Sequence, residues 1–337
     1  MYRSVFRILM IAAWAWLAVG CKKQISATSD TKFVLGTDVT ITLYDPGLTA
    51  ANAEPMLKEA FGILAEWDRI ACKPGPDNQV AKITQGAGAQ SVSVEDAVFE
   101  MLTKALRLYD ASNKAFDIRY GPLLDLWGFD KTPRVPTSAQ VDSAKALVST
   151  GGLFVAGHSI LLAKKGMRFD AREIVVGHAF DMAAAKLAEK GVRTAMISAP
   201  RVCRTIGDPP TARGFPWAVA NPLNPKMKWA TLWVPVGGAA CAAMSENRFQ
   251  YGGKSYHSLL DPRTGYPADK CSAAIVQATD AATAQALAFA AFVWGGTDSL
   301  ETVGKSAVSG AVIVHEQGGV LKNSISGSLT DRLDAAK

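Results

Sequence analysis

The sequence lacks several features that would indicate a function class by composition alone. Its five cysteines form no C-x-x-C pair, which argues against a zinc site. No low-complexity tract and no repeat of solenoid period occurs in the 337 residues. The net charge is only +6, and no basic stripe with interleaved aromatic residues is present, so nucleic-acid binding is not expected. An apolar content of 49% and a charged content of 20% are ordinary for a globular protein with a sizeable core.

A hydrophobic run long enough to span a bilayer comfortably is also absent. The apolar run 8–19 is short, follows Arg3 and Arg7, and is itself followed by Gly20 and Cys21. A basic start, a short apolar segment and a small residue before a cysteine are typical of a bacterial lipoprotein signal. An uncleaved anchor helix is the alternative interpretation of the same segment.

From this pattern we expect residues 1–20 to be a signal peptide, Cys21 to carry lipid and residues 21–32 to be a tether. The expected location is the periplasmic side of a bacterial membrane, and Lys22 favours the outer membrane. An oxidising compartment permits disulfides. The sequence leaves their pairing open among Cys72, Cys203, Cys241 and Cys271.

Helical and strand periodicities alternate along the rest of the chain without a strict βαβ rhythm. They predict helices at 50–70, 93–109, from Ser138 onward, 182–190 and 281–294, and strands at 33–44, 153–155, 160–163, 194–198, 217–222, 229–236, 237–244, 273–278 and 311–315. Ser93 with Asp96 is expected to form a capping box, and Ser138 an N-cap. We therefore expect an α+β domain over 33–325 with a largely antiparallel sheet and flanking helices, followed by a tail at 326–337.

The segment that carries the clearest chemistry is 255–267, which reads SYHSLLDPRTGYP. The run from Asp261 to Gly265 predicts a tight turn, because proline fixes φ, aspartate bonds the backbone two residues on and glycine accepts positive φ. Directly before it, His257 and Ser258 place an imidazole beside a hydroxyl. A hairpin corner with ordinary polar residues would explain the same letters.

This segment resembles the hallmark of the FAD:protein FMN transferases, the ApbE or thiamine-biosynthesis lipoprotein family. A second segment, 115–129, reads AFDIRYGPLLDLWGF and is similar to the part of that family that contacts the adenosine half of FAD. Taken singly, its apolar residues are ordinary core residues. The resemblance extends from Phe33 to about Leu321, and it implies two similar lobes with flavin held in the crevice between them.

The resemblance also implies a reaction, in which FAD is the substrate. The family cleaves the FAD pyrophosphate and moves the FMN phosphoryl group onto a threonine of a partner protein, with help from Mg²⁺. The partner here would be a flavin-accepting exported or membrane protein. The implied catalytic residues are His257, Ser258 and Asp261; the implied flavin-binding residues are Leu35, Ala115, Phe116, Asp117, Asp170, Arg172, Glu173 and Val176; the family's metal positions are Gln285 and Phe289.

Several of these positions depart from the family. Gln285 and Phe289 stand where the family has aspartate and threonine as metal ligands, so Mg²⁺ is not expected to bind in the usual way. Arg172 and Glu173 replace two glycines and Val176 a lysine. The usual Ser-His order is reversed, so the family's histidine position falls on Ser258, and Leu35 replaces methionine at nearly equal volume.

These departures predict weak or lost transferase activity. A non-catalytic flavin- or partner-binding periplasmic lipoprotein is the alternative, and an unrelated exported heme- or quinone-pathway protein is a third. Arg172 and Arg201 could hold phosphate without metal, and Glu173 could replace the lost carboxylate. If the crevice exists, residues as distant as Phe116, Asp117, Asp170 and Asp261 should line one cavity.

Overall fold

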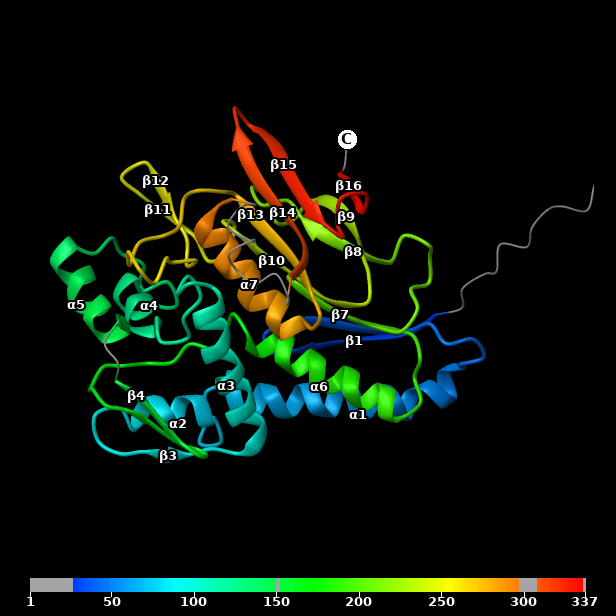
Figure 1. Cartoon of the computed structure of the whole chain (residues 1–337), viewed down its shortest axis with the longest axis horizontal. Coiled ribbons are helices and arrows are strands. Elements are labelled where there is room, and N and C mark those ends of the chain that lie inside the picture. Colours follow the sequence, from blue (N-terminus) through cyan, green and yellow to red (C-terminus); the bar gives the residue numbers. More distant parts are fainter. Residues whose placement is uncertain (1–26, 150–151, 297–307, 336–337) are drawn as a thin grey trace, which may run out of the picture.

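The computed structural model describes residues 27–149, 152–296 and 308–335 (Figure 1). The expected signal peptide and Cys21 lie outside the described residues. Within them, no helix is both long enough and apolar enough to cross a membrane.

The centre of the molecule is an eight-stranded sheet in which every neighbouring pair of strands is antiparallel. The strand order is β1-β2-β6-β7-β10-β13-β14-β15, so sequence-distant strands meet in the middle. The strands are β1 (Thr28–Val34), β2 (Thr37–Leu43), β6 (Ala195–Ser198), β7 (Val202–Ile206), β10 (Gly237–Ala243), β13 (Ala273–Ala278), β14 (Val308–Gln317) and β15 (Val320–Gly327).

Three helices cover one face of this sheet and a second, small sheet covers the other (Figure 1). The helices are α1 (Ala50–Trp67), α6 (Val175–Glu189) and α7 (Ala281–Trp294). The small sheet contains β8 (Phe215–Ala220), β9 (Lys228–Val234) and β16 (Leu333–Ala335). Each interface is a separate hydrophobic core, because strand side chains alternate between the two faces.

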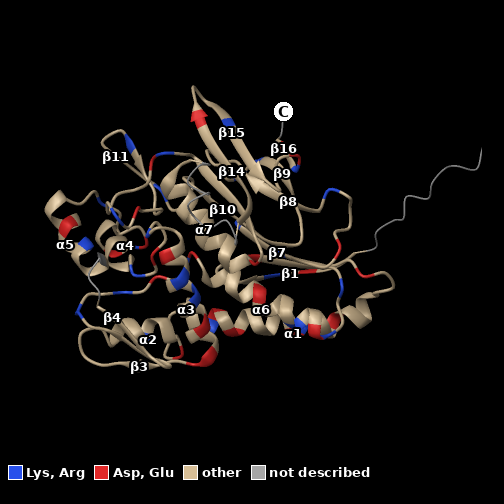
Figure 2. Ribbon diagram, viewed as in Figure 1, with Lys and Arg blue, Asp and Glu red and all other residues tan. Residues whose placement is uncertain are grey.

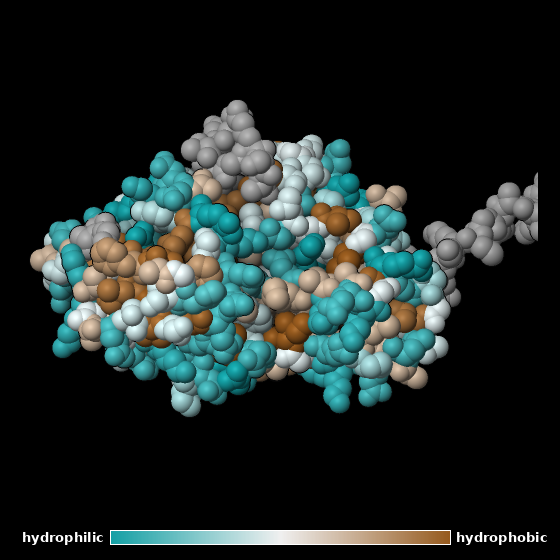
Figure 3. Space-filling model, turned by 60° about the horizontal axis from the view of Figure 1, so that its bottom comes forward, coloured by the Kyte–Doolittle hydropathy of each residue, from teal (hydrophilic) through white to brown (hydrophobic). Residues whose placement is uncertain are grey.

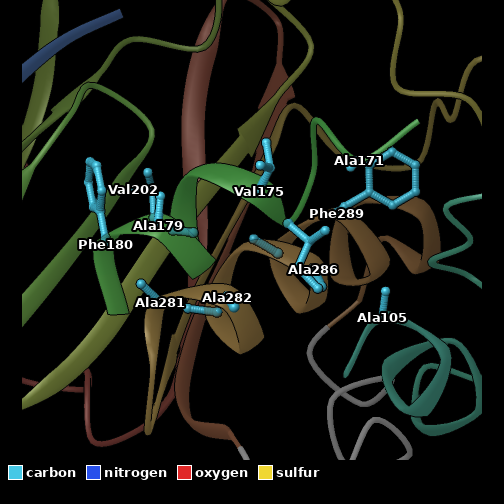
Figure 4. Close-up of a cluster of buried hydrophobic side chains, with 14 of the residues drawn as sticks. Ala105, Ala171, Val175, Ala179, Phe180, Val202, Ala281, Ala282, Ala286 and Phe289 are labelled. Carbon is cyan, nitrogen blue, oxygen red and sulfur yellow. The ribbon is translucent and has the colours of Figure 1, made fainter. Parts of the chain in front are cut away.

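Helix α7 is apolar on all sides and buried along its length. A helix with this pattern belongs in a core rather than at a surface. It lies against α6, where Gly177 allows the close approach: a Cβ there would come within 2.4 Å of the Ala281 carbonyl oxygen. Figure 4 shows the small side chains of Ala281, Ala282 and Ala286 at this interface, with Phe289 further along the helix.

The remaining elements form a smaller part beside the main sheet (Figure 1). They are the π-helical turn η1 (Asp68–Cys72), α2 (Gln79–Gln85), β3 (Val92–Ser93), α3 (Asp96–Ala111), α4 (Gly121–Trp127), α5 (Ser138–Ser149), β4 (Leu153–Ala156), β5 (Ser159–Leu162), β11 (Phe249–Tyr251) and β12 (Lys254–Tyr256). Acidic and basic residues are interspersed over the whole ribbon (Figure 2). Apolar residues form separate spots on the face shown in Figure 3.

The structure confirms the mixed class and the largely antiparallel sheet, and the predicted bounds of α7 and β13 are correct. The two parts of the molecule are unequal in size and content, however, because half of the described strands belong to one continuous sheet. The tether was predicted to extend to residue 32, but Thr28–Val34 is strand β1, paired to β2. Part of the predicted tail is likewise strand β16, paired to β9.

Three local predictions were wrong at helix starts. Ser93 lies in β3, and α3 begins after Glu95 with no side-chain cap. Helix α5 is capped by Thr137 rather than Ser138, through reciprocal hydrogen bonds between Thr137 and Gln140. Helix α6 begins at Val175, seven residues before the predicted start, because its first turn is buried and carries no polar cap signal.

Candidate functional site

A cavity of about 920 Å³ opens where the β1–β2 turn, η1, α2 and the start of α6 meet. This volume is within the range of small-molecule sites in proteins. The residues that line it are Leu35, Gly36, Thr37, Ala71, Cys72, Asn78, Val80, Ala81, Thr84, Gln85, Asp130, Arg168, Phe169, Asp170, Ala171, Arg172, Val175, Val176, Ala199, Pro200, Arg201, Val202 and Gln285. We call this cavity the main pocket.

Leu35 enters the main pocket from the two-residue turn between β1 and β2. Its φ is 57° and that of Gly36 is 75°, so both residues are left-handed, as in the tight turns that suit the twist of a hairpin. Leucine adopts this conformation rarely. The turn places the Leu35 side chain in the pocket wall with only 7% of the residue exposed. The flavin contact expected of Leu35 stays a prediction.

A second wall is formed by the loop that begins at Asp170. Its Oδ1 accepts hydrogen bonds from the backbone nitrogen of Arg172 at 3.1 Å and from Arg172 Nε at 2.8 Å. The other end of the guanidinium lies 2.7 Å from Asp130 Oδ2, and it lowers the pKa of that carboxyl. Arg168 forms ion pairs with Asp125 at 2.8 Å and Asp170 at 3.4 Å. Both arginines are thus paired with carboxylates.

A third wall contains Arg201, which lies between two carboxylates from different segments. Nη2 is 2.8 Å from Glu173 Oε2, and Nη1 is 2.5 Å from Glu246 Oε2. Glu173 is only 3% exposed, so it is an internal partner of Arg201 rather than a free pocket carboxylate. Burial raises the pKa of Glu246 to about 8, although the Arg201 charge opposes that rise.

The family's metal positions, Gln285 and Phe289, both make contacts within the protein. Gln285 Oε1 accepts a hydrogen bond from the Gly177 backbone nitrogen at 2.8 Å, and its Nε2 donates to the Arg172 carbonyl at 2.9 Å. Phe289 is 1% exposed and lies against Phe116, with ring centroids 6.3 Å apart. Over the described ranges, no three His, Cys, Asp or Glu side chains are close enough to hold a metal ion. A neutral amide with both ends bonded and an apolar ring do not supply the anionic oxygens that Mg²⁺ prefers.

The predicted catalytic residues lie outside the main pocket. His257 is 5% exposed and lies edge-on to Phe292, and burial lowers its pKa to about 4. Ser258 is also buried. Both Asp261 oxygens bond to Arg263, at 2.9 and 2.8 Å. These three residues were expected to lie at the flavin crevice. In the structure their side chains are buried in the protein and do not line the main pocket.

The predicted adenosine contacts are buried as well. Ala115 is fully buried, Phe116 is 2% exposed, and Asp117 forms two hydrogen bonds with Arg119 at 2.8 and 2.9 Å. None of the three lines the main pocket. Of the four residues expected to converge on one cavity, only Asp170 does so, and that prediction was wrong.

The two motif segments instead meet each other. Trp127 donates from Nε1 to the Gly265 carbonyl oxygen at 2.9 Å, across 138 positions of sequence. Gly265 has a φ of 82°, and a Cβ there would come within 2.5 Å of Val141. Glycine is therefore needed at this corner both for its conformation and for the space. The tight turn predicted from the sequence is present, and its role here is to join two parts of the scaffold.

Comparison of the sequence with known protein families gives a match over most of the chain. The sequence model of the ApbE family matches residues 35–313. This chain belongs to the ApbE family.

Relatives of this ApbE chain are named FAD:protein FMN transferase. The protein from Haemophilus influenzae is 24% identical, over 94% of this chain and 95% of that protein. The protein from Salmonella typhimurium is 29% identical, over 77% of this chain and 78% of that protein. The ApbE crystal structure from Thermotoga maritima is 25% identical with a TM-score of 0.76, covering 89% of this chain and 97% of that one. The flavinyl transferase ApbE of Pseudomonas stutzeri has the same TM-score at 22% identity.

Sequence reasoning missed several residues of the pocket in this ApbE chain. Arg168 and Asp130 line the pocket and form ion pairs there, and Glu246, which does not line it, pairs with Arg201 from the segment after β10. Asp130 directly follows the recognised 115–129 segment, and a search for carboxylates next to motif ends would have found it. Glu246 had no such signal, because its partners Arg201 and Glu173 are distant in sequence.

Proposed function

We propose that this ApbE-family chain binds a flavin nucleotide, FAD in the first instance, in the main pocket, and that its Mg²⁺-dependent transfer of FMN is weak or lost. The names of its relatives support FAD as the ligand. The pocket supports it because its lining combines apolar residues such as Leu35 and Val176 with charged ones such as Arg172 and Arg201. A planar ring and a pyrophosphate require these two kinds of surface.

One observation supports the loss of transfer most strongly. Gln285 uses both ends of its amide to join the start of α6 to the Arg172 carbonyl. An oxygen already bonded to a buried backbone N–H is a poor ligand for a cation, and Phe289 offers none. No step of the proposed function therefore passes through Mg²⁺. Arg172 and Arg201 would bind and orient the phosphates as permanent cations.

The proposal is tested by a transfer assay. The purified chain is incubated with FAD and a peptide that carries an acceptor threonine, once with Mg²⁺ and once with EDTA, and covalent flavin is detected by fluorescence after denaturation. We expect FAD to bind reversibly and no fluorescence to stay on the peptide. Covalent flavin that appears only with Mg²⁺ would contradict the proposal and indicate an active transferase.

We also propose that the chain acts as a lipoprotein at the periplasmic side of a membrane, anchored through Cys21 and near a flavin-accepting exported or membrane protein. The support is the signal pattern ahead of Cys21. The change Cys21→Ala should move the protein from the membrane fraction to the exported soluble fraction. An unchanged membrane fraction would argue against a lipid anchor.

A further inference from the structure

Arg201 is a pocket arginine whose positive charge is more than balanced by its carboxylate partners. Arg201 has two carboxylate partners, and together with Glu173 and Glu246 it makes a group of one cation and two carboxylates. With both carboxylates ionised, this group carries a net charge of −1, which repels an anionic ligand. Arg201 nevertheless lines the main pocket, and its side chain is 41% exposed, unlike that of Glu173.

Glu246 is held in place independently of Arg201. Its Oε1 accepts a hydrogen bond from the Ala243 backbone nitrogen at 3.0 Å, and its own backbone nitrogen donates to the Ala243 carbonyl at 3.1 Å. The next residue, Asn247, donates to Asp130 at 3.1 Å, so this segment is also hydrogen-bonded to a residue that lines the pocket. The carboxyl group can therefore change its charge without losing its position.

We propose that Arg201 is the phosphate-binding residue of the main pocket and that Glu246 controls it through its own proton. When Glu246 is ionised, it holds Nη1 of Arg201 and leaves the group anionic. When Glu246 takes a proton from solvent, the attraction is lost and Nη1 turns to a phosphate oxygen of the ligand. Glu173 keeps Nη2 and so preserves the direction of the guanidinium. This inference rests on the proposed function and names the residues that would replace a metal ion.

The groups around Glu246 favour a change of its charge near neutral pH, where it could control Arg201. Arg201 lowers its pKa, while Glu173 raises it and Arg172 lowers it more weakly. The Cys241 thiol lies nearby on β10, and burial raises its pKa to about 12, so it stays neutral. Burial outweighs these charges, which places the Glu246 transition near pH 8. A bound phosphate next to the carboxyl would raise the pKa further, so binding takes up a proton above that pH.

The test is the affinity for FAD as a function of pH, without Mg²⁺. FAD is a suitable probe because its pyrophosphate oxygens stay ionised throughout this range. Between pH 9 and pH 7 the wild-type affinity should rise by about tenfold, as linkage to one group with a pKa near 8 requires. In Glu246→Gln the amide keeps the bond to the Ala243 nitrogen but does not titrate. Its affinity should be high and nearly constant over the same range.

Two further variants test whether the pH dependence of FAD binding is specific to the Arg201–Glu246 pair. Asp334→Asn removes the carboxylate of another Arg–Asp pair, with Arg213 at 2.6 Å outside the pocket, and should leave the wild-type pH profile unchanged. Arg201→Gln in the Glu246→Gln background removes the Arg201–Glu246 pair without leaving the Glu246 carboxylate behind, although Glu173 loses its arginine partner. It should weaken FAD binding by about tenfold or more. Thermal unfolding of each variant verifies that it is folded.

The outcomes are distinguishable. A wild-type affinity that does not change with pH, or a Glu246→Gln profile equal to that of the wild type, overturns the Glu246 inference and leaves the flavin-binding proposal intact. A failure to bind FAD at every pH in every variant overturns both. Calorimetry in two buffers gives a separate readout, because proton uptake on binding above pH 8 should be present in the wild type and absent in Glu246→Gln.

Discussion

The two motif segments and the wall of the main pocket differ in how they are built. Segments 115–129 and 255–267 are mostly buried, hydrogen-bonded to each other and close to the family in sequence. The pocket wall, by contrast, contains Arg172, Arg201 and Gln285 at positions where the resemblance implies other residues. The two motif segments that carry the resemblance therefore stabilise the fold through buried contacts, while the departures from the resemblance lie in the wall of the main pocket.

The largest effect is expected in the scaffold. Trp127→Ala removes a fully buried ring and its bond to Gly265, and large aromatic truncations in cores cost about 3–5 kcal/mol. Tyr266→Ala is the matched control, because Tyr266 lies in the same motif but is 41% exposed. Denaturant unfolding should show a loss for Trp127→Ala several times that for Tyr266→Ala. Equal losses would show that the joint between the two segments does not stabilise the fold.

A slightly smaller effect is expected from acid, again in the scaffold. Burial lowers the pKa of His257 to about 4, below the ordinary value near 6.5, so the unfolded chain binds the proton more readily. The stability contributed by neutral His257 is present above pH 6.5 and is lost as the pH falls toward 4. The total linked to this residue is about 3 kcal/mol.

The change His257→Gln should flatten this part of the dependence of the unfolding free energy on pH. Unfolding is measured in denaturant at pH 7 and pH 4.5. A slope that His257→Gln does not reduce would place the acid sensitivity elsewhere.

A still smaller effect is expected at the pocket wall. Gln285→Asp shortens the side chain and removes the amide donor, so Gly177 and Arg172 lose their buried partners, at a cost of about 1–3 kcal/mol. Gln250→Asp, on an exposed residue, is the control. Adding Phe289→Thr to Gln285→Asp should give no better than partial recovery of Mg²⁺ binding. Strong Mg²⁺ binding by the double variant would show that only two ligands were missing.

The sequence predicted the fold better than the site, for physical reasons. The bounds of α7 and β13 follow from local apolar patterns, and the turn at Gly265 follows from local backbone chemistry. The pocket depends on contacts between distant segments, such as the one between Arg201 and Glu246, and no local pattern encodes them. His257 illustrates the same limit, since its reactive side chain has a sequence signal but its orientation depends on the packing of Phe292.

The central claim is that the pocket binds flavin nucleotide through arginines rather than through a metal ion. The most direct measurement is a fluorescence titration of the purified chain with FAD, in Mg²⁺ and in EDTA, at low and at high salt. The account predicts the same affinity in Mg²⁺ and in EDTA, and a lower affinity at high salt, because ions screen the attraction between guanidinium and phosphate. An affinity that collapses in EDTA would contradict it.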